Sequence, residues 1–383
     1  MTDGKHSSNH PQLPPTSEED RILWLRLLRS RRVGPATFHR LLREFGNVAA
    51  AFDELPNIAK EASVKDYAPC EAVVAIREME AAKRFGAVPL FHGTLTYPEA
   101  LYDLPDAPPL LWAFGDTSLL MRPQIALVGA RNASSLGTRM ARSMAKDIGQ
   151  RGHVIVSGMA RGIDAAAHAA SLESGTIAVF GGGIDVIYPV ENSELAKQIG
   201  EKGLILSEQP MGLQPRARHF PQRNRIISGL SKAVVVVEAS AKSGTLITAK
   251  NALDQGRDVF AVPGHPIESR ASGCNMLIRD GATLIRSGAD VIEALAPIAP
   301  IALEAAQQEL RLDIPSPLKP TTLRDTALLH RQIIDRVSHA PIAEDSLIRE
   351  LQTPTEQTAS ALVDLELAGR ILRTSNGLLT RIS

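Results

Sequence analysis

The sequence is poor in cysteine and in aromatic residues, and each shortage excludes a class of site. Its 383 residues include two cysteines, Cys70 and Cys274, with no CxxC pair and no neighbouring pair of histidines. This excludes a disulfide framework and a cysteine-rich zinc site, and we expect no metal. Aromatic residues make up 4% of the chain, so any stacking on nucleobases must use a few rings or arginine planes.

Net charge is lacking as well. The chain holds 42 Lys/Arg and 42 Asp/Glu, which argues against a protein that coats a polyanion along its whole length. Residues 122–230 nevertheless carry 13 Lys/Arg against 8 Asp/Glu, whereas residues 1–121 and 231–383 have net charges of −3 and −2. A positive middle between acidic ends indicates a local anion site, with a chance fluctuation as the alternative.

Targeting segments and long apolar runs are also missing. The first 20 residues are polar and contain prolines, with no charged start followed by an apolar stretch, and no run of 18 apolar residues occurs. We therefore expect a cytoplasmic protein that does not associate with membranes.

The two ends of the chain predict small helical domains. Residues 1–17 are expected to form a disordered tail. Residues 18–90 form a helical domain, because apolar residues recur at helical spacing on both sides of Val33-Gly34-Pro35. This arrangement is typical of a SAM-like or helix-hairpin-helix domain, in which either DNA contact or packing alone explains the pattern. Residues 322–383 predict helices at about 326–338, 343–351 and 355–368, then a hairpin turning at Asn376-Gly377, which is a winged-helix layout.

The central region, residues 91–297, predicts an α/β domain with an extended Rossmann-like, doubly wound parallel sheet. Residues 91–121 are proline-dense and are expected to be an irregular connecting segment, and residues 298–321 a linker. Apolar strands alternate with stretches long enough for crossover helices. The predicted strands are Ile125–Gly129, His153–Ser157, Thr176–Phe180, Gly203–Leu206, Ala233–Glu238, Asp258–Ala261 and Ala282–Ile285.

Because ligands of open α/β sheets bind at the carboxyl ends of the strands, the residues after each strand are the candidates for a site. After the first strand, Gly129 permits a tight turn and Arg131 offers a guanidinium to a phosphate. Ser134 or Ser135 can cap a helix while donating to an anion. After the second, Arg161 repeats this design and Asp164 is expected to cap the next helix. There is no GxGxxG, no ribose-binding carboxylate and no GxxxxGK[ST], which disfavours an NAD-binding protein or a P-loop NTPase.

Three further segments fit a phosphate strand. The glycine-dense loop around Gly182 permits close approach of the backbone to a ligand. The segment 215–225 has four arginines and no acidic residue; it includes Phe220 as a base-stacking candidate and precedes the helix containing residues 226–230. Lys242, Ser243 and Gly244 precede another helix start. Several such loops at one sheet edge indicate a ligand with several phosphates.

The motifs GARNASSLG, SGMARGIDAAAH, FGGGIDVIYPVEN, FPQRNRIISGLS, EASAKSGTLITA and VPGHP, in this order, resemble the DNA-processing protein A (DprA/Smf) family. The resemblance covers about 160 residues of the core. It implies binding and protection of incoming single-stranded DNA, loading of the RecA recombinase during natural transformation, and a homodimer formed through the core, with no catalysis and no cofactor. Carried over by motif, the phosphate-binding residues are Arg131, Ser134, Arg223, Asn224, Arg225, Lys242, Ser243 and Gly244, with Arg161 as a further candidate.

Two features depart from the resemblance or from its simplest interpretation. Relatives often carry lysine after the Tyr-Pro of the glycine loop, whereas Val190 follows here. The presumed recognition helix of the winged-helix domain, residues 355–368, has no Lys or Arg, so we expect it to contact protein rather than DNA. An enzyme acting on nucleotides and a nucleotide-sensing domain remain alternative functions, although His168, on an apolar helix, is expected to be packed.

Overall fold

The computed structural model describes residues 14–296, 323–337, 341–374 and 378–382. Most of the predicted tail, the linker and the turn at residues 376–377 lie outside the described residues. The chain divides into two compact units, residues 1–25 with 72–306 and residues 26–71 with 307–383. No helix in the described ranges has both the length and the apolar character that a membrane crossing requires.

A nine-stranded sheet forms the centre of the first unit, in the order β1-β2-β6-β5-β4-β3-β7-β8-β9. From β6 to β9 neighbouring strands are parallel, while β2 pairs antiparallel with both β1 and β6. The strands are β1 (Val88–Phe91), β2 (Leu110–Gly115), β3 (Gln124–Gly129), β4 (Val154–Ser157), β5 (Thr176–Val179), β6 (Leu204–Ser207), β7 (Ala233–Glu238), β8 (Asp258–Ala261) and β9 (Thr283–Leu284).

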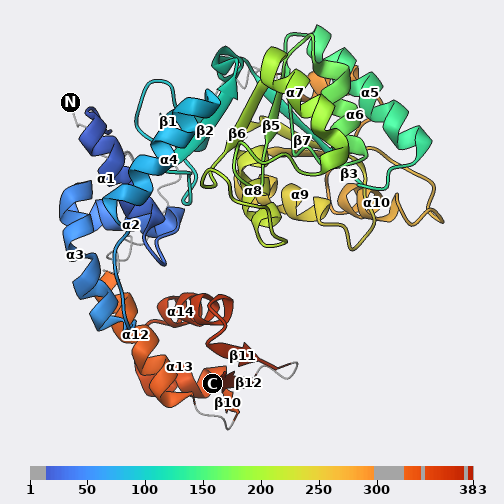
Figure 1. Ribbon diagram of the computed structural model, residues 1–383. Coiled ribbons are helices and arrows are strands. Elements are labelled where there is room, and N and C mark those ends of the chain that lie inside the picture. Colours follow the sequence, from blue (N-terminus) through green and yellow to red (C-terminus); the bar gives the residue numbers. More distant parts are fainter. Residues whose placement is uncertain (1–13, 297–322, 338–340, 375–377, 383) are drawn as a thin grey trace, which may run out of the picture. The chain divides into compact units, whose positions relative to one another are not determined.

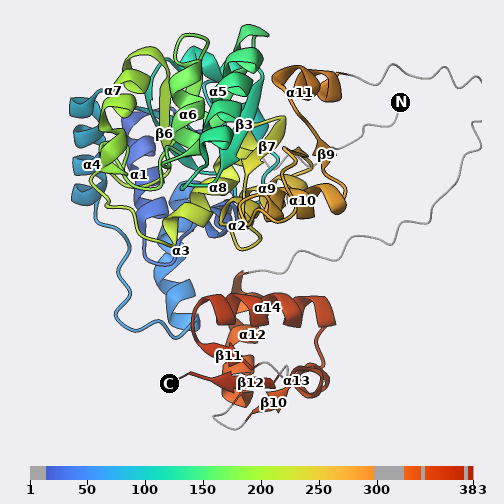
Figure 2. The same cartoon turned by 90° about the vertical axis from the view of Figure 1, so that its right-hand side faces the viewer.

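Helices cover both faces of this sheet, as the sequence predicts for a doubly wound fold (Figures 1 and 2). Side chains of α5, α6 and α11 share one apolar core with one face of the strands, and side chains of α8, α9 and α10 share another core with the opposite face. The helices of this part are α4 (Ala72–Phe85), α5 (Ser135–Gln150), α6 (Ile163–Ser171), α7 (Ser193–Lys202), α8 (His219–Leu230), α9 (Thr245–Asp254), α10 (Ser272–Arg279) and α11 (Gly288–Leu295), with short 3-10 turns η1 (Glu99–Leu101), η2 (Thr117–Met121) and η3 (Val190–Asn192).

The order of the parallel strands places the reversal of the sheet between β3 and β7. Within the parallel part of the sheet, the chain first forms β3 and then proceeds outward through β4, β5 and β6. It then returns to the other side of β3 to form β7, β8 and β9. Loops that leave β3 and β7 therefore diverge to opposite faces and leave a crevice at their carboxyl ends. This is the position at which the sequence places its candidate site.

The seven predicted strands all occur, but the sheet also contains β1 and β2, which the sequence analysis missed. Residues 88–90 were assigned to the helical domain, and residues 91–121 to an irregular connection. The prolines of this stretch precede β2 rather than interrupt it, and Pro89 is tolerated because β1 is an edge strand. Trp112 of β2 is fully buried, and its indole N–H donates to Glu78 (3.1 Å).

The helices of the N-terminal region are α1 (Glu18–Arg29), α2 (Pro35–Phe45) and α3 (Val48–Glu61). Pro35 occupies the first turn of α2, where its missing N–H costs nothing, and Gly46 ends that helix in the left-handed conformation at φ 80°. This is the helix–Val-Gly-Pro–helix unit expected from the sequence.

The C-terminal region has the predicted winged-helix elements. They are α12 (Leu323–Arg336), β10 (Ile342–Ala343), α13 (Glu344–Leu351), α14 (Thr355–Leu367), β11 (Ile371–Arg373) and β12 (Leu378–Arg381). The three strands pair in the order β10-β12-β11, and side chains from α12, α13 and α14 form a separate apolar core with them.

We expect Gly115→Ala to destabilise the first unit by more than about 1 kcal/mol. Gly115 ends β2 at φ 113°, and a Cβ there would lie 2.3 Å from the carbonyl oxygen of Gly203. Gly244→Ala is the control, because Gly244 has helical backbone angles and open space around it. It should change stability by less than about 0.5 kcal/mol in urea unfolding. Equal effects of the two substitutions would contradict the close approach of Gly115 to the Gly203 backbone.

Candidate nucleic-acid interface

A cavity of about 820 Å³, called the main cavity below, lies at the crevice where the loops after β3 and β7 diverge. Its lining carries three arginines, Arg131, Arg223 and Arg270, and a single acidic residue, Asp164. Other lining residues come from the loop after β3, from the start of α8 and from the start of α9: Gly129, Asn132, Phe220, Asn224, Ser240, Ser243, Gly244, Thr245 and Thr248 among them. The lining is therefore net positive and rich in backbone and hydroxyl donors.

Arg131 is the exposed cation of this cavity. It lies in the loop after β3, and its guanidinium carbon stands 5.1 Å from the centre of the Phe220 ring. No carboxylate of the described residues lies within ion-pair distance of it. The preceding Gly129 is required by packing, because a Cβ there would come within 2.5 Å of the Ile163 side chain. Arg131 is thus held against an aromatic ring with its charge available to an anion.

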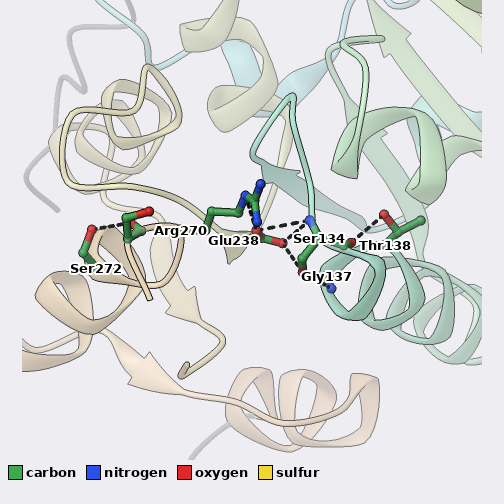
Figure 3. Close-up of polar contacts among 7 residues, drawn as sticks. Ser134, Gly137, Thr138, Glu238, Arg270 and Ser272 are labelled. Carbon is green, nitrogen blue, oxygen red and sulfur yellow. Dashed lines mark hydrogen bonds and ion pairs between the residues drawn. The ribbon is translucent and has the colours of Figure 1, made fainter. Parts of the chain in front are cut away.

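The start of α5 is occupied by the protein's own carboxylate (Figure 3). Glu238, the last residue of β7, accepts hydrogen bonds from the backbone N–H of Ser134 (3.1 Å) and from its hydroxyl (3.0 Å). The Ser134 hydroxyl oxygen in turn accepts from the N–H of Gly137 (2.9 Å). Of the two candidate serines, Ser134 is therefore the one that caps the helix. Gly137 lets the carboxylate lie this close to the helix, since a Cβ would come 1.9 Å from a Glu238 oxygen and the carboxylate would have to move. The Ser134 hydroxyl, expected to contact a phosphate, donates to Glu238 instead.

Arg270 also reaches this carboxylate, with its Nε 3.7 Å from Glu238 Oε1. Arg270 lies in the loop between β8 and α10, and its side chain is partly exposed. The sequence analysis missed both residues. The signals available were an acidic residue at the end of the apolar run AVVVVE and an arginine in the segment after the next strand, VPGHPIESR.

Arg223 lies under the floor of the main cavity and is buried. Its NH1 donates to the carbonyl oxygens of Gly158 and Val179, which follow or end β4 and β5. Burial lowers the pKa of the Arg223 guanidinium to about 10, and the nearby Asp164 carboxylate opposes this shift. Gly158 leaves room for the guanidinium, which a Cβ would meet at 2.2 Å. Arg223 thus binds strand ends together beneath the cavity.

Asp164 differs from its predicted role as a helix cap. The N-cap position of α6 is Gly162, and Asp164 is the second residue of the helix. Its carboxylate turns back to accept from the N–H groups of Gly158 (3.1 Å) and Ala160 (3.3 Å). Burial raises the pKa of Asp164, and Arg223 and the two N–H donors oppose that rise. The residue orders the loop after β4 rather than the helix start.

The arginine-rich segment divides into exposed and buried members. The sequence analysis places residues 223–225 before the helix. In the structure α8 begins at His219, so these residues lie inside it. The Arg225 side chain is 11% exposed and forms ion pairs with Asp106 (3.0 Å) and Glu208 (2.5 Å). Arg216 and Arg218, upstream of the helix, are exposed. Within the described part of the chain, these two arginines of the segment have no carboxylate partner, although Arg218 donates to the His219 ring (3.3 Å).

The remaining predicted residues fall into two groups. Asn224, Ser243 and Gly244 line the main cavity together with Phe220, and Arg161 lines a second cavity of about 220 Å³, called the second cavity below. The predicted residues that line neither cavity are Ser134, Gly182, Arg225 and Lys242. Gly182 is buried beneath the backbone of Leu213, and Lys242 is exposed next to Ser243.

Among the described residues, no three His, Cys, Asp or Glu side chains gather as a metal site. His168 is fully buried and hydrogen-bonded to Thr176 (2.7 Å), which agrees with its expected packing role. Burial lowers the pKa of His168 to about 3, so the ring is neutral near pH 7.

Three family models match the chain. The DprA-like N-terminal HHH domain matches residues 18–81, DNA recombination-mediator protein A matches residues 89–296, and the DprA winged helix domain matches residues 317–377. Together they follow the three structural regions described above.

Individual relatives agree with these models. Protein Smf of Synechocystis is 32% identical over 93% of this chain and 97% of its own length. DNA processing protein DprA of Streptococcus pneumoniae is 47% identical over 51% of this chain and 70% of its own, and its X-ray structure has a TM-score of 0.59 at 34% identity, over 71% of this chain and 97% of that one. DNA processing protein A of Helicobacter pylori, whose structure concerns its single-stranded DNA binding mode, has a TM-score of 0.51 at 32% identity, over 55% and 95%.

The ion pairs of Arg225 predict a structural role. Arg225→Met should lower the free energy of unfolding by about 3 kcal/mol, because it removes the largely buried guanidinium that pairs with the Glu208 and Asp106 carboxylates. Arg279→Met is the matched control, since Arg279 is 74% exposed and, among the described residues, pairs with its neighbour Asp280 alone. It should change stability by less than about 0.5 kcal/mol. A loss below about 1 kcal/mol for Arg225→Met in urea unfolding would count against this role.

Proposed function

The chain belongs to the DprA/Smf family of DNA recombination-mediator proteins, and from this premise we propose that it binds single-stranded DNA through the main cavity without performing chemistry on it. The observation that carries the proposal is Arg131, an exposed guanidinium at the cavity with no carboxylate partner among the described residues. A phosphate is a tetrahedral anion with several acceptor oxygens, and a planar guanidinium can donate two parallel hydrogen bonds to it.

The surroundings of Arg131 support a strand rather than a single phosphate. Ser243, Gly244 and Thr245 bring the start of α9 to the same cavity, where backbone N–H groups favour an anion. Arg216 and Arg218 are exposed beside the lining residues Pro215 and Ala217. Separate donors on several loops of one sheet edge suit the successive phosphates of a backbone.

In our proposal the start of α5 is not one of the groups that bind the DNA phosphates. Glu238 takes up the Ser134 donors there, and its negative charge disfavours a second anion at the same place. We therefore place the single-stranded DNA on the side of the cavity formed by Arg131, α8 and α9. Arg223 supports this surface from beneath.

The finer roles rest on family membership. We propose that the protein protects incoming DNA and loads the RecA recombinase in the cytoplasm during natural transformation, as a homodimer formed through the core. The winged-helix domain is proposed to contact protein, because α14 carries no Lys or Arg and therefore offers no cation to a phosphate backbone.

Arg131→Ala is expected to weaken binding to single-stranded DNA by roughly tenfold at low salt, because it removes a charge-assisted phosphate contact. The slope of log K against log salt should become shallower by about 0.7. Arg279→Ala, at an exposed arginine that lines neither cavity, is the control and should leave both quantities unchanged. Fluorescence anisotropy over a salt series measures both; an unchanged slope for Arg131→Ala would remove this residue from the interface.

The protein should prefer single strands over duplex of the same length at matched salt. The reason is that only a single strand can present its phosphates and bases inside a cavity. Competition between an oligonucleotide and its annealed duplex measures the preference. Equal affinities would point to a general basic surface.

Removal of residues 322–383 should lower the affinity for single-stranded DNA by less than tenfold, since no residue proposed to bind a phosphate lies in that region. A loss of tenfold or more, in the same anisotropy assay, would assign DNA contact to the winged-helix domain.

A further inference from the structure

The outer side of α5 carries three cationic side chains in a row. Arg139, Arg142 and Lys146 are exposed, and at 3.6 residues per turn they lie within about 60° of one another around the helix axis. The opposite side of α5 is buried against one face of the sheet, through Met144 and Ile148 among others (Figure 1). The three cations, called the α5 cation row below, therefore point away from the sheet toward solvent.

No acidic residue balances this row. From residue 130 to residue 146 the chain has four Lys/Arg and no Asp/Glu. The acidic residue of α5, Asp147, lies against Gly288 of α11 and pairs with Arg151. Among the described residues, no carboxylate lies within ion-pair distance of any member of the row.

Two other exposed helices of the same unit show the more usual arrangement, in which charges of both signs alternate. On α4, Arg84 pairs with Glu80, and on α7, Lys197 pairs with Glu194. In the α5 cation row, like charges stand three and four residues apart, which destabilises a helix. Its first member, Arg139, is also close to the positive end of the helix dipole. A row that lowers helix stability and has no counter-charge in the described chain is suited to an external anion.

The row begins beside the proposed DNA site. Arg131, which lines the main cavity, precedes the first residue of α5 by four positions, and Arg139 follows that residue by four. Between them, Ser134 is bound by Glu238, whose side chain is 9% exposed and lies 3.7 Å from the Arg270 guanidinium (Figure 3). The helix start is thus occupied and its carboxylate is offset. A strand that leaves the cavity past Arg131 can reach Arg139, one turn into the helix.

The composition of this face favours a nucleic-acid strand over an acidic protein segment. Protein interfaces depend on a centre of apolar or aromatic side chains. Within α5, which the structure describes throughout, Leu136 is the large apolar side chain that is exposed, whereas Ser135 and Ser143 are its exposed uncharged neighbours. A phosphate backbone requires only cations at intervals along it. The row spans about 10 Å along the helix axis, a length that a few successive phosphates cover.

We propose that the α5 cation row extends the DNA site, so that a single strand continues along the outer side of α5 after it leaves the main cavity at Arg131. This rests on the proposed function and adds an outer segment that binds phosphates alone. Short strands are held in the cavity, and only longer strands reach the row. The row therefore raises affinity for long strands without reading their sequence.

A combined variant, Arg139→Gln, Arg142→Gln and Lys146→Gln, tests the extension and is called the α5 variant below. The probes are oligothymidylates of increasing length, from about 6 to about 30 nucleotides. For the longest strands, affinity at low salt should fall roughly tenfold, and the slope of log K against log salt should become shallower by about 2, the sum of three phosphate contacts. For the shortest strands, both quantities should equal those of the wild type. Fluorescence anisotropy over a salt series measures both.

The matched control removes the same charge elsewhere on the unit. Arg84→Gln, Lys197→Gln and Arg279→Gln together replace three exposed cations that each pair with a nearby acidic residue and do not line the main cavity. This control variant has the net charge of the α5 variant and should bind every length like the wild type.

Folding of the α5 variant is checked by thermal unfolding. Its Tm should equal or exceed that of the wild type, because contacts between like charges are removed. Arg142→Gln alone is the milder second variant, and it should make the salt slope for the longest strands shallower by about 0.7.

The outcomes separate the extension from the proposed function. If the α5 variant binds every length like the wild type while Arg131→Ala is weakened, the row does not bind DNA and the cavity site stands. If the control variant loses as much affinity, or if the α5 variant loses the same affinity for the shortest and the longest strands, the extension is again wrong. A wild-type protein that binds no oligothymidylate of any length would overturn the proposed function itself.

Discussion

The buried guanidinium of Arg223 is the interaction on which the shape of the candidate site depends. A charge without water must be hydrogen-bonded and paired. The NH1 group of Arg223 donates to the carbonyl oxygens of Gly158 and Val179 and its charge interacts with the nearby Asp164 carboxylate, whereas its Nε has no hydrogen-bond partner among the described residues. The two carbonyl groups end or follow two neighbouring strands. Satisfying one buried charge therefore fixes two loops at the carboxyl edge of the sheet, and Arg131 and Phe220 lie above them.

The arginines of this region accordingly have two roles, which burial distinguishes. Arg223 and Arg225 are enclosed and hold protein groups, whereas Arg131, Arg216 and Arg218 are exposed. Glu238 has a related structural role, because its carboxylate, at the end of β7, binds the N-cap residue of α5, the helix that follows β3. In our proposal the nucleic acid meets only the cations that remain exposed.

Much of this architecture could be predicted from the sequence, because local pattern determines it. The seven parallel strands, the helices between them and the winged-helix elements follow from apolar periodicity and turn residues. The strands β1 and β2 could not be predicted in this way. Prolines in and near them are typical of an irregular segment, and only the antiparallel pairing identifies the strands. The main cavity lies at the sheet edge where the sequence analysis places the candidate residues. The separation of Arg225 from Arg131 was not predicted, because it depends on Asp106 and Glu208, which are distant in sequence.

Hydrogen–deuterium exchange of the full chain, with and without a saturating oligothymidylate, tests most directly whether the main cavity holds the strand. We predict slower exchange on binding at the backbone amides of residues 130–132, 215–220 and 243–246, with the amides of α12, α13 and α14 unchanged. Protection confined to the winged-helix domain or to the N-terminal helices, with no change around Arg131, would contradict the account.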